Sequence, residues 1–148
     1  MKILNIIFQV IIFGTLTGSL VSILSVGFVL GVKNISDFRI ENSSCLFKLS
    51  EYCFSGTPLV SLFLAAIVIV LVKKILNISR YHGPADVILS AHSPSTELDA
   101  KTGFLSTFSA FISASGGASV GQYGPLVHLG GTIGNFINRQ VPGLLSKD

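Results

Sequence analysis

Two long runs without a charged side chain constrain this chain more than any other feature of its sequence. The first run covers thirty residues, from Ile3 to Val32, and the second covers nineteen, from Phe54 to Val72. About twenty apolar residues are enough for an α-helix to cross a bilayer. The chain is 49% hydrophobic and only 11% charged, whereas about a quarter of the residues are charged in ordinary soluble domains. We therefore predict an all-α integral membrane protein, multi-pass, with spans at about 3–32 and 54–72.

The first run admits one alternative, a cleaved signal peptide. A signal peptide would have a shorter apolar core and a small-residue cleavage site, so the length of the run favours a membrane helix. Within it, Gly14 and Gly18 are four residues apart, and so are Gly27 and Gly31. Each pair puts two glycines on one helix face, where we expect another helix to approach closely.

The basic residues indicate topology rather than nucleic-acid binding, because the net charge is only +3 and the bases flank the apolar runs. Lys2 precedes the first run, and Lys73, Lys74 and Arg80 follow the second. We expect both of these ends in the cytoplasm. The stretch from Lys33 to Tyr52 has balanced charge, so we expect a solvated loop outside the bilayer.

The cysteines and histidines give no metal-binding pattern. Cys45 and Cys53 lie in the external segment, where a disulfide and two unpaired thiols are both open alternatives. His82, His92 and His128 are far apart in the sequence, so we expect neither a zinc nor a haem site. The long spans also lack carboxylates and paired histidines, so we expect no enzyme and no cofactor.

The second half of the chain predicts shorter helices. Tyr81-His82-Gly83-Pro84 reads as a break followed by a short helix at about 84–92. This helix either lies on the membrane surface or dips partway into the bilayer with its N-terminus inward. Further helices are predicted at about 102–120 and 125–138. The former has small residues at steps of four, which predicts packing on protein: Ser106, Ala110, Ala114 and Ala118 on one face, and Ser109, Ser113, Gly117 and Gly121 on the next.

The link between the last two helices is Gly121-Gln122-Tyr123-Gly124-Pro125. Proline is tolerated in the first turn of a helix, so a new helix is expected to begin here. A glycine-rich link that leads into an apolar helix inside a membrane aims backbone N–H groups at an anion.

These residues resemble the CLC family of chloride channels and chloride/proton exchangers. Gly121-Gln122-Tyr123-Gly124-Pro125, followed by Leu126-Val127-His128-Leu129-Gly130, is similar to the family motif G-[K/R]-E-G-P, an apolar residue and V-[Q/H]-[I/L]-G. Tyr81-His82-Gly83-Pro84 stands where the family has G-S-G-I-P, and only its proline aligns without argument.

The resemblance implies a fold and a set of partners. The fold is a partial CLC-type bundle with tilted, broken and re-entrant helices, one membrane domain over residues 1–148. The implied anion site is built from helix N-termini, at Gly121, Gln122, Tyr123, Gly124 and Pro125 in one motif and at Tyr81 and Gly83 in the other. Chloride is the transported ion, the lipid bilayer is the surroundings, and no nucleic acid is expected. The family is dimeric, so we expect a homodimer when complete, in the plasma (inner) membrane.

Two departures from the family matter for function. Tyr123 stands where the family has the glutamate that gates the pathway and, in exchangers, carries the proton, and Gln122 replaces the basic residue. A phenol releases its proton only at about pH 10, so we expect Tyr123 to occupy the gate position without relaying protons. In the other motif Tyr81 stands where the family has its serine. Passive anion permeation is therefore favoured over exchange.

The third family motif, G-x-F-x-P, does not occur in this sequence. We therefore expect an N-terminal fragment whose remaining half is supplied elsewhere, and we expect that it does not conduct alone. The alternative is a non-conducting membrane packing subunit or assembly factor, in which the glycines serve only helix packing.

Overall fold

The computed structural model of the protein describes residues 2–43, 45–49, 52–93 and 98–140. Five helices and a two-stranded hairpin follow one another in the order α1, β1, β2, α2, α3, α4, α5. Packing divides the chain into two compact units. The first unit comprises the described parts of 1–26, 81–107 and 123–148, and the second comprises those of 27–80 and 108–122.

Helix α1 runs from Lys2 to Glu41, so it continues nine residues beyond the predicted span at 3–32. Its 40 residues correspond to about 60 Å at 1.5 Å per residue. No glycine or proline stands between Lys33 and Glu41, and charged residues do not by themselves end a helix. The expected external loop is therefore partly helical.

Two helices are long and apolar enough to cross a membrane. They are α1, counted from Ile7, and α2, which runs from Thr57 to Ile75. Within the described chain most of their large apolar side chains are exposed, among them Phe8 at 64% and Phe63 at 69%. Such a surface suits lipid and would be a liability in water. The all-α membrane fold predicted from the sequence is confirmed in its helical content.

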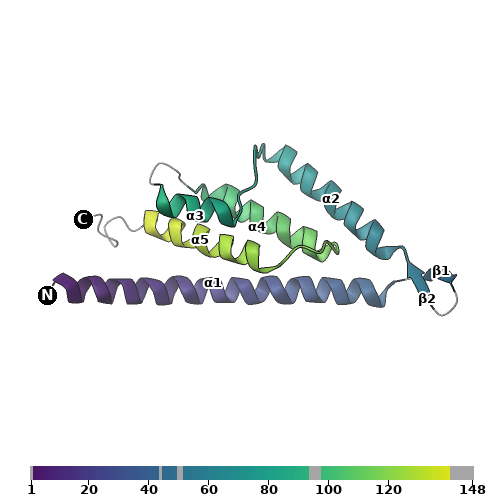
Figure 1. The fold of residues 1–148 in the computed structure, drawn as a ribbon, viewed down its shortest axis with the longest axis horizontal. Helices are drawn as coiled ribbons and strands as arrows, with labels where there is room; N and C mark the ends of the chain where they lie inside the picture. Colours follow the sequence, from purple (N-terminus) through teal and green to yellow (C-terminus); the bar gives the residue numbers. More distant parts are fainter. Residues whose placement is uncertain (1, 44, 50–51, 94–97, 141–148) are drawn as a thin grey trace. The chain divides into compact units, whose positions relative to one another are not determined.

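A small β-hairpin connects α1 to α2 (Figure 1). Strand β1, Cys45–Leu49, pairs antiparallel with β2, Tyr52–Ser55, and the register is irregular between Cys45 and Phe47. Cys45 is disulfide-bonded, and the other cysteine of the sequence, Cys53, lies on the facing strand. Of the two alternatives for the cysteines, the structure has the disulfide. The hairpin itself was not predicted.

In the second unit, Arg39 joins the ends of three helices. Its Nη1 donates to the carbonyl oxygen of Gly116 at 2.6 Å and to Ser61 Oγ at 3.1 Å. The Ser61 hydroxyl also donates to the Gly116 carbonyl, at 2.8 Å. Gly116 directly follows the last residue of α4, which runs from Ala100 to Ser115. The guanidinium therefore satisfies a carbonyl at the negative end of the α4 dipole.

Helix α4 ends earlier than the predicted 102–120 because the chain reverses at Gly117. This glycine has φ +103°, a conformation that residues with a Cβ rarely adopt. Its N–H donates to the carbonyl of Ala114, and the N–H of Ala118 donates to that of Ser113. This pair of bonds is the Schellman arrangement that closes many helices. A Cβ at Gly117 would also collide with the Arg39 guanidinium.

The close approach of another helix, which was predicted at the paired glycines of α1, is found at one of them. Gly31 faces Phe111 of α4, and a Cβ there would lie 2.8 Å from the ring. Phe111 also meets Phe28 edge to face, with ring centroids 5.4 Å apart. Gly14, Gly18 and Gly27 have no described neighbour within 4 Å of such a Cβ, so close helix approach is not seen at them.

In the first unit, helices pack closely against α5. Helix α3, Pro84–His92, lies beside α5, Tyr123–Gln140 (Figure 1). A Cβ at Gly131 of α5 would collide with Val87 of α3, and one at Gly103 of α4 would collide with Thr132 of α5. The most buried side chains of α5 lie on this inner face: His128, Leu129, Thr132 and Ile133.

The small-residue faces predicted for α4 are packed on protein in part: Ser106 and Ser109 are buried, whereas Gly117 and Gly121 are exposed. Thr107 in the first unit and Ser115 in the second are buried as well. The Ser106 and Thr107 hydroxyls donate to carbonyls four residues earlier in the same helix. The hydroxyls of Ser106 and Thr107 therefore need no outside partner, whereas those of Ser109 and Ser115 are buried without a partner among the described residues.

Candidate functional site

The two breaks found in the sequence both start helices, and those helices meet at their N-termini. Pro84 is the first residue of α3, and α5 begins at Tyr123, two residues before Pro125. A Cβ built at Gly124 would lie 3.6 Å from Cγ of Pro84, an ordinary van der Waals distance. The structure thus brings Gly124 of the second motif to Pro84 of the first, and both residues lie in the first unit.

The N-terminus of α5 presents backbone N–H groups. The first N–H groups of a helix have no carbonyl partner in the preceding turn. At α5 these belong to Gln122, Tyr123 and Gly124, whereas Pro125 has none to give. The first turn of α5 contains no acidic residue, so the positive end of its dipole is not compensated by a carboxylate of its own.

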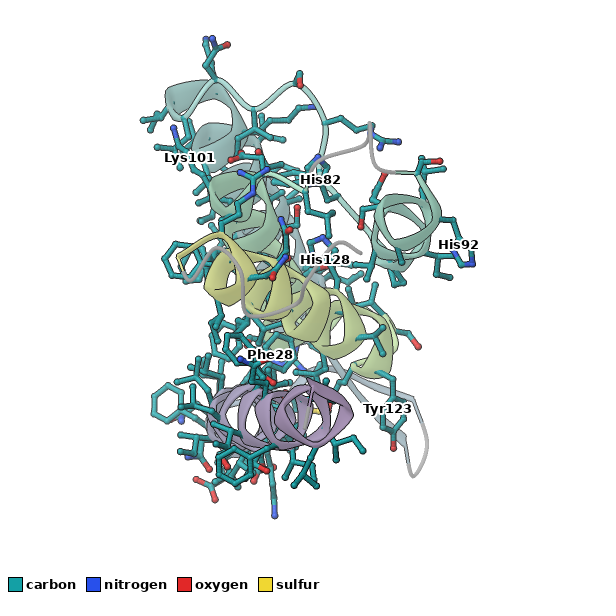
Figure 2. All side chains as sticks on the ribbon, turned by 90° about the vertical axis from the view of Figure 1, so that its left-hand side faces the viewer. Phe28, His82, His92, Lys101, Tyr123 and His128 are labelled. Carbon is teal, nitrogen blue, oxygen red and sulfur yellow. The ribbon has the colours of Figure 1, made fainter. Side chains whose placement is uncertain are left out.

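The Tyr123 side chain points away from the interior of the unit. It is 84% exposed, and Figure 2 shows it projecting away from His82 and His128. Gly121 is also exposed, while Gln122, Gly124 and Pro125 are half-buried. The backbone of this turn, rather than the phenol, therefore faces the neighbouring helix α3.

The N-terminus of α3 is satisfied by the protein itself. The Gly83 N–H donates to the Asp86 carboxylate at 2.7 Å. The His82 N–H donates to Ser106 Oγ at 2.8 Å. Tyr81, directly before them, is half-buried. A carboxylate at this end offsets the positive end of the α3 dipole, so α3 supplies less positive potential to the site than α5 does.

Asp86 is the residue whose role the sequence did not reveal. Its position in the first turn of a helix was visible, and a carboxylate there suits the dipole. Its bond to the Gly83 N–H was a recognisable possibility, because an acidic residue three positions after the cap is part of the capping-box pattern. The structure shows that this bond occupies one N–H that the resemblance would offer to an anion.

Two histidines that are distant in the sequence lie together. The rings of His82 and His128 have centroids 6.2 Å apart and meet edge to face (Figure 2). His128 is 1% exposed. Its Nε2 and the Nδ1 of His82 are buried without a hydrogen-bond partner among the described residues. Their separation in the sequence did not indicate this proximity, although the period of the buried face of α5 could have indicated that His128 points inward.

The histidine pair does not by itself amount to a metal centre. In the described part of the chain no three residues of the types histidine, cysteine, aspartate and glutamate come close enough to hold a metal ion. The site that remains is a junction of two helix N-termini: the first turn of α5 has no acidic residue, and N–H groups before α3 are bonded to Asp86 and Ser106.

Fold and site together define a membrane protein with apolar spans and with two helices that begin at glycine–proline breaks and meet there. The sequence model of the voltage gated chloride channel family matches residues 62–147, which is more than half of the chain. The chain therefore belongs to the voltage-gated chloride channel family. Neither the curated proteins nor the solved structures contain a significant match to it.

Proposed function

We propose that this chain contributes one anion-binding position to a pathway for passive chloride permeation. The position is the N-terminal turn of α5, with the N–H groups of Gln122, Tyr123 and Gly124 as donors. The observation that carries the proposal is the contact between Gly124 and Pro84, which places this turn at the junction of the two breaks.

The charge at such a site suits conduction. A helix N-terminus carries a partial charge of roughly half a unit. This attracts an anion without the tight binding that a full positive side chain would produce in a low dielectric. Irregular backbone at membrane depth is tolerated where it lines a cavity rather than lipid. The family match supports chloride as the anion.

Tyr123 at the gate position supports permeation without proton exchange. The phenol is exposed rather than folded over the turn of α5. In general a carboxyl group exchanges its proton several pH units below a phenol, so a glutamate is the better proton carrier. Chloride movement is therefore proposed to be independent of a proton gradient.

The test is a pair of substitutions at one position, Tyr123→Glu and Tyr123→Phe, in the assembled transporter that contains this chain. Chloride flux from proteoliposomes is measured with and without an imposed pH gradient. We expect Tyr123→Glu to change chloride flux and to make it respond to the gradient, and Tyr123→Phe to remain insensitive to it. Unchanged flux in both variants would count against an anion pathway at this turn.

A second candidate is a non-conducting packing subunit. It is favoured by the close contacts of Gly103, Gly116 and Gly131, where an added Cβ would meet a neighbouring side chain. The same flux experiment separates the two functions, because a packing subunit predicts no dependence of flux on the identity of residue 123.

A further inference from the structure

The histidine pair of the first unit has two nitrogens that the proposed anion site does not use. Nδ1 of His82 and Nε2 of His128 are both buried, and neither has a hydrogen-bond partner among the described residues. The two rings nevertheless meet edge to face, with centroids 6.2 Å apart. A neutral imidazole has one N–H and one bare nitrogen, whereas a protonated imidazole has two N–H donors. The pair is therefore a place where a proton changes the bonding needs of the interior.

The pair lies where α3 meets α5. His82 directly precedes Gly83, the cap residue of α3, and its N–H is held by Ser106 Oγ of α4. His128 belongs to α5 and is 1% exposed. The two rings face each other across the contact between these elements (Figure 2). A change in the charge of either ring therefore acts directly on the packing of α3 against α5.

The closed packing favours the uncharged form of both rings. A proton added to either unpartnered nitrogen would create a buried N–H without an acceptor, and burying an unpaired charge is costly. Two charged rings in contact would also repel one another. A charged ring is better accommodated where it can reach water, so protonation favours a state in which the helices have separated.

The charged groups around the pair do not remove this cost. Asp86 of α3 interacts electrostatically with His128, and Asp99, just before α4, interacts with His82. Both carboxylates attract a proton to the pair, but neither is bonded to the two unpartnered nitrogens. Each carboxylate already accepts a hydrogen bond from a backbone N–H at the start of its own helix. The other ionisable side chains of these segments are Arg80, Tyr81 and His92 around α3, Lys101 in α4, and Tyr123 and Arg139 in α5.

We propose that the histidine pair is an acid-sensitive latch on the junction of α3 and α5. With both rings neutral the latch is closed, and proton uptake separates the N-terminus of α3 from α5. This separation takes Pro84 away from Gly124 and so changes the surroundings of the first turn of α5. The latch goes beyond the proposed function, because it concerns the packing of two helices and does not require an anion at that turn.

The experiment measures how fast a cysteine between the two helices reacts with 4,4′-dithiodipyridine at different pH, in the full chain in detergent micelles. Val87→Cys places a thiol at the contact, because Val87 packs against Gly131 of α5. Ile88→Cys places one on the next residue of α3, which is 62% exposed. The ratio of the two rates removes the pH dependence of the reagent. We expect this ratio to rise as the pH falls, by up to about tenfold per pH unit where each opening takes up one proton.

Histidine variants assign the response to the pair. His128→Phe keeps an aromatic ring without a titrating nitrogen, so we expect the ratio to stay constant with pH, and His82→Phe tests the same point if His128→Phe does not fold. His92→Gln removes an exposed histidine at the other end of α3 and should keep the response. A ratio that is constant with pH when all three histidines are present would overturn the proposal. So would a rise that survives in the phenylalanine variants or is lost in His92→Gln. Because no chloride flux is measured, failure of the latch leaves the proposed anion position untouched.

Discussion

Gly131 and Gly134 of α5 differ in their surroundings although they are only three residues apart. A Cβ at Gly131 would collide with Val87 of α3, whereas one at Gly134 has no described atom within 4 Å. Val87 is β-branched, so it has little rotamer freedom with which to yield. Packing against α3 therefore leaves no room for a side chain at Gly131. At Gly134 the described residues leave room for one.

This contrast predicts opposite effects of alanine on stability. Gly131→Ala should destabilise the protein by about 1–3 kcal/mol, the usual cost of overpacking. Gly134→Ala should be neutral or stabilising by up to about 1 kcal/mol, because alanine is the better helix former. Thermal unfolding in detergent micelles compares the two. If both variants shifted the melting temperature equally, the packing of α3 against α5 would not be as described.

At the site, the contacts of individual side chains were the part least predictable from the sequence. The motif identified the turn from Gly121 to Pro125 and the break at Gly83-Pro84, and the structure joins them. It did not reveal that Asp86 accepts the Gly83 N–H or that His128 meets His82. The contact of His128 depends on the rotation of α5 about its axis, which spacing along the chain does not determine, whereas the contact of Asp86 is local to the first turn of α3.

At the scale of elements, helix ends were harder to predict than helices. Charge-free runs mark where a segment can sit in lipid, so they missed the nine residues by which α1 continues past Val32. Helix α4 ended at Ser115 because Gly117 takes a positive φ, a feature that the sequence contained and the small-residue pattern obscured. The beginning of α5 differed by two residues, since proline fits anywhere in a first turn.

The beginning of α4 has a side-chain cap with a predictable pH dependence. Asp99 Oδ2 accepts hydrogen bonds from the Thr102 hydroxyl at 2.6 Å and from the Thr102 N–H at 2.9 Å. The hydroxyl and then the N–H of Thr102 lower the pKa of Asp99 below its ordinary value. Because the folded pKa is depressed, the cap stabilises the protein above the unfolded pKa of about 3.9. That stability is lost as the pH falls through the lower, folded pKa.

Asp99→Ala should therefore cost about 0.5–2 kcal/mol at pH 7, and this difference from the unmodified protein should shrink in strong acid, below the ordinary carboxyl range. Asp99→Asn is the control, because asparagine is also a good cap and does not titrate. Thermal unfolding of the three proteins at neutral and acidic pH measures the effect. A gap between the unmodified protein and Asp99→Ala that stays constant with pH would show that the carboxylate is not the stabilising group.

At the scale of the whole chain, the family and the membrane class were predictable from sequence, and the balance between the two helix N-termini was not. The resemblance implied an anion site built from both of these helix N-termini. The structure instead has an α5 whose first turn contains no acidic residue, so no carboxylate of that turn meets the N–H groups that a helix leaves without a partner within itself. Its neighbour α3 carries Asp86 at the same end. This asymmetry leads us to place the anion at α5.

The most direct test of that placement is anomalous diffraction from crystals of the protein soaked in bromide, which substitutes for chloride. The account predicts an anomalous peak within hydrogen-bonding distance of the backbone nitrogens of Tyr123 and Gly124, beside Pro84. A map that resolves α3 and α5 but shows no bromide at this turn, or shows it only at surface lysines, would contradict the account.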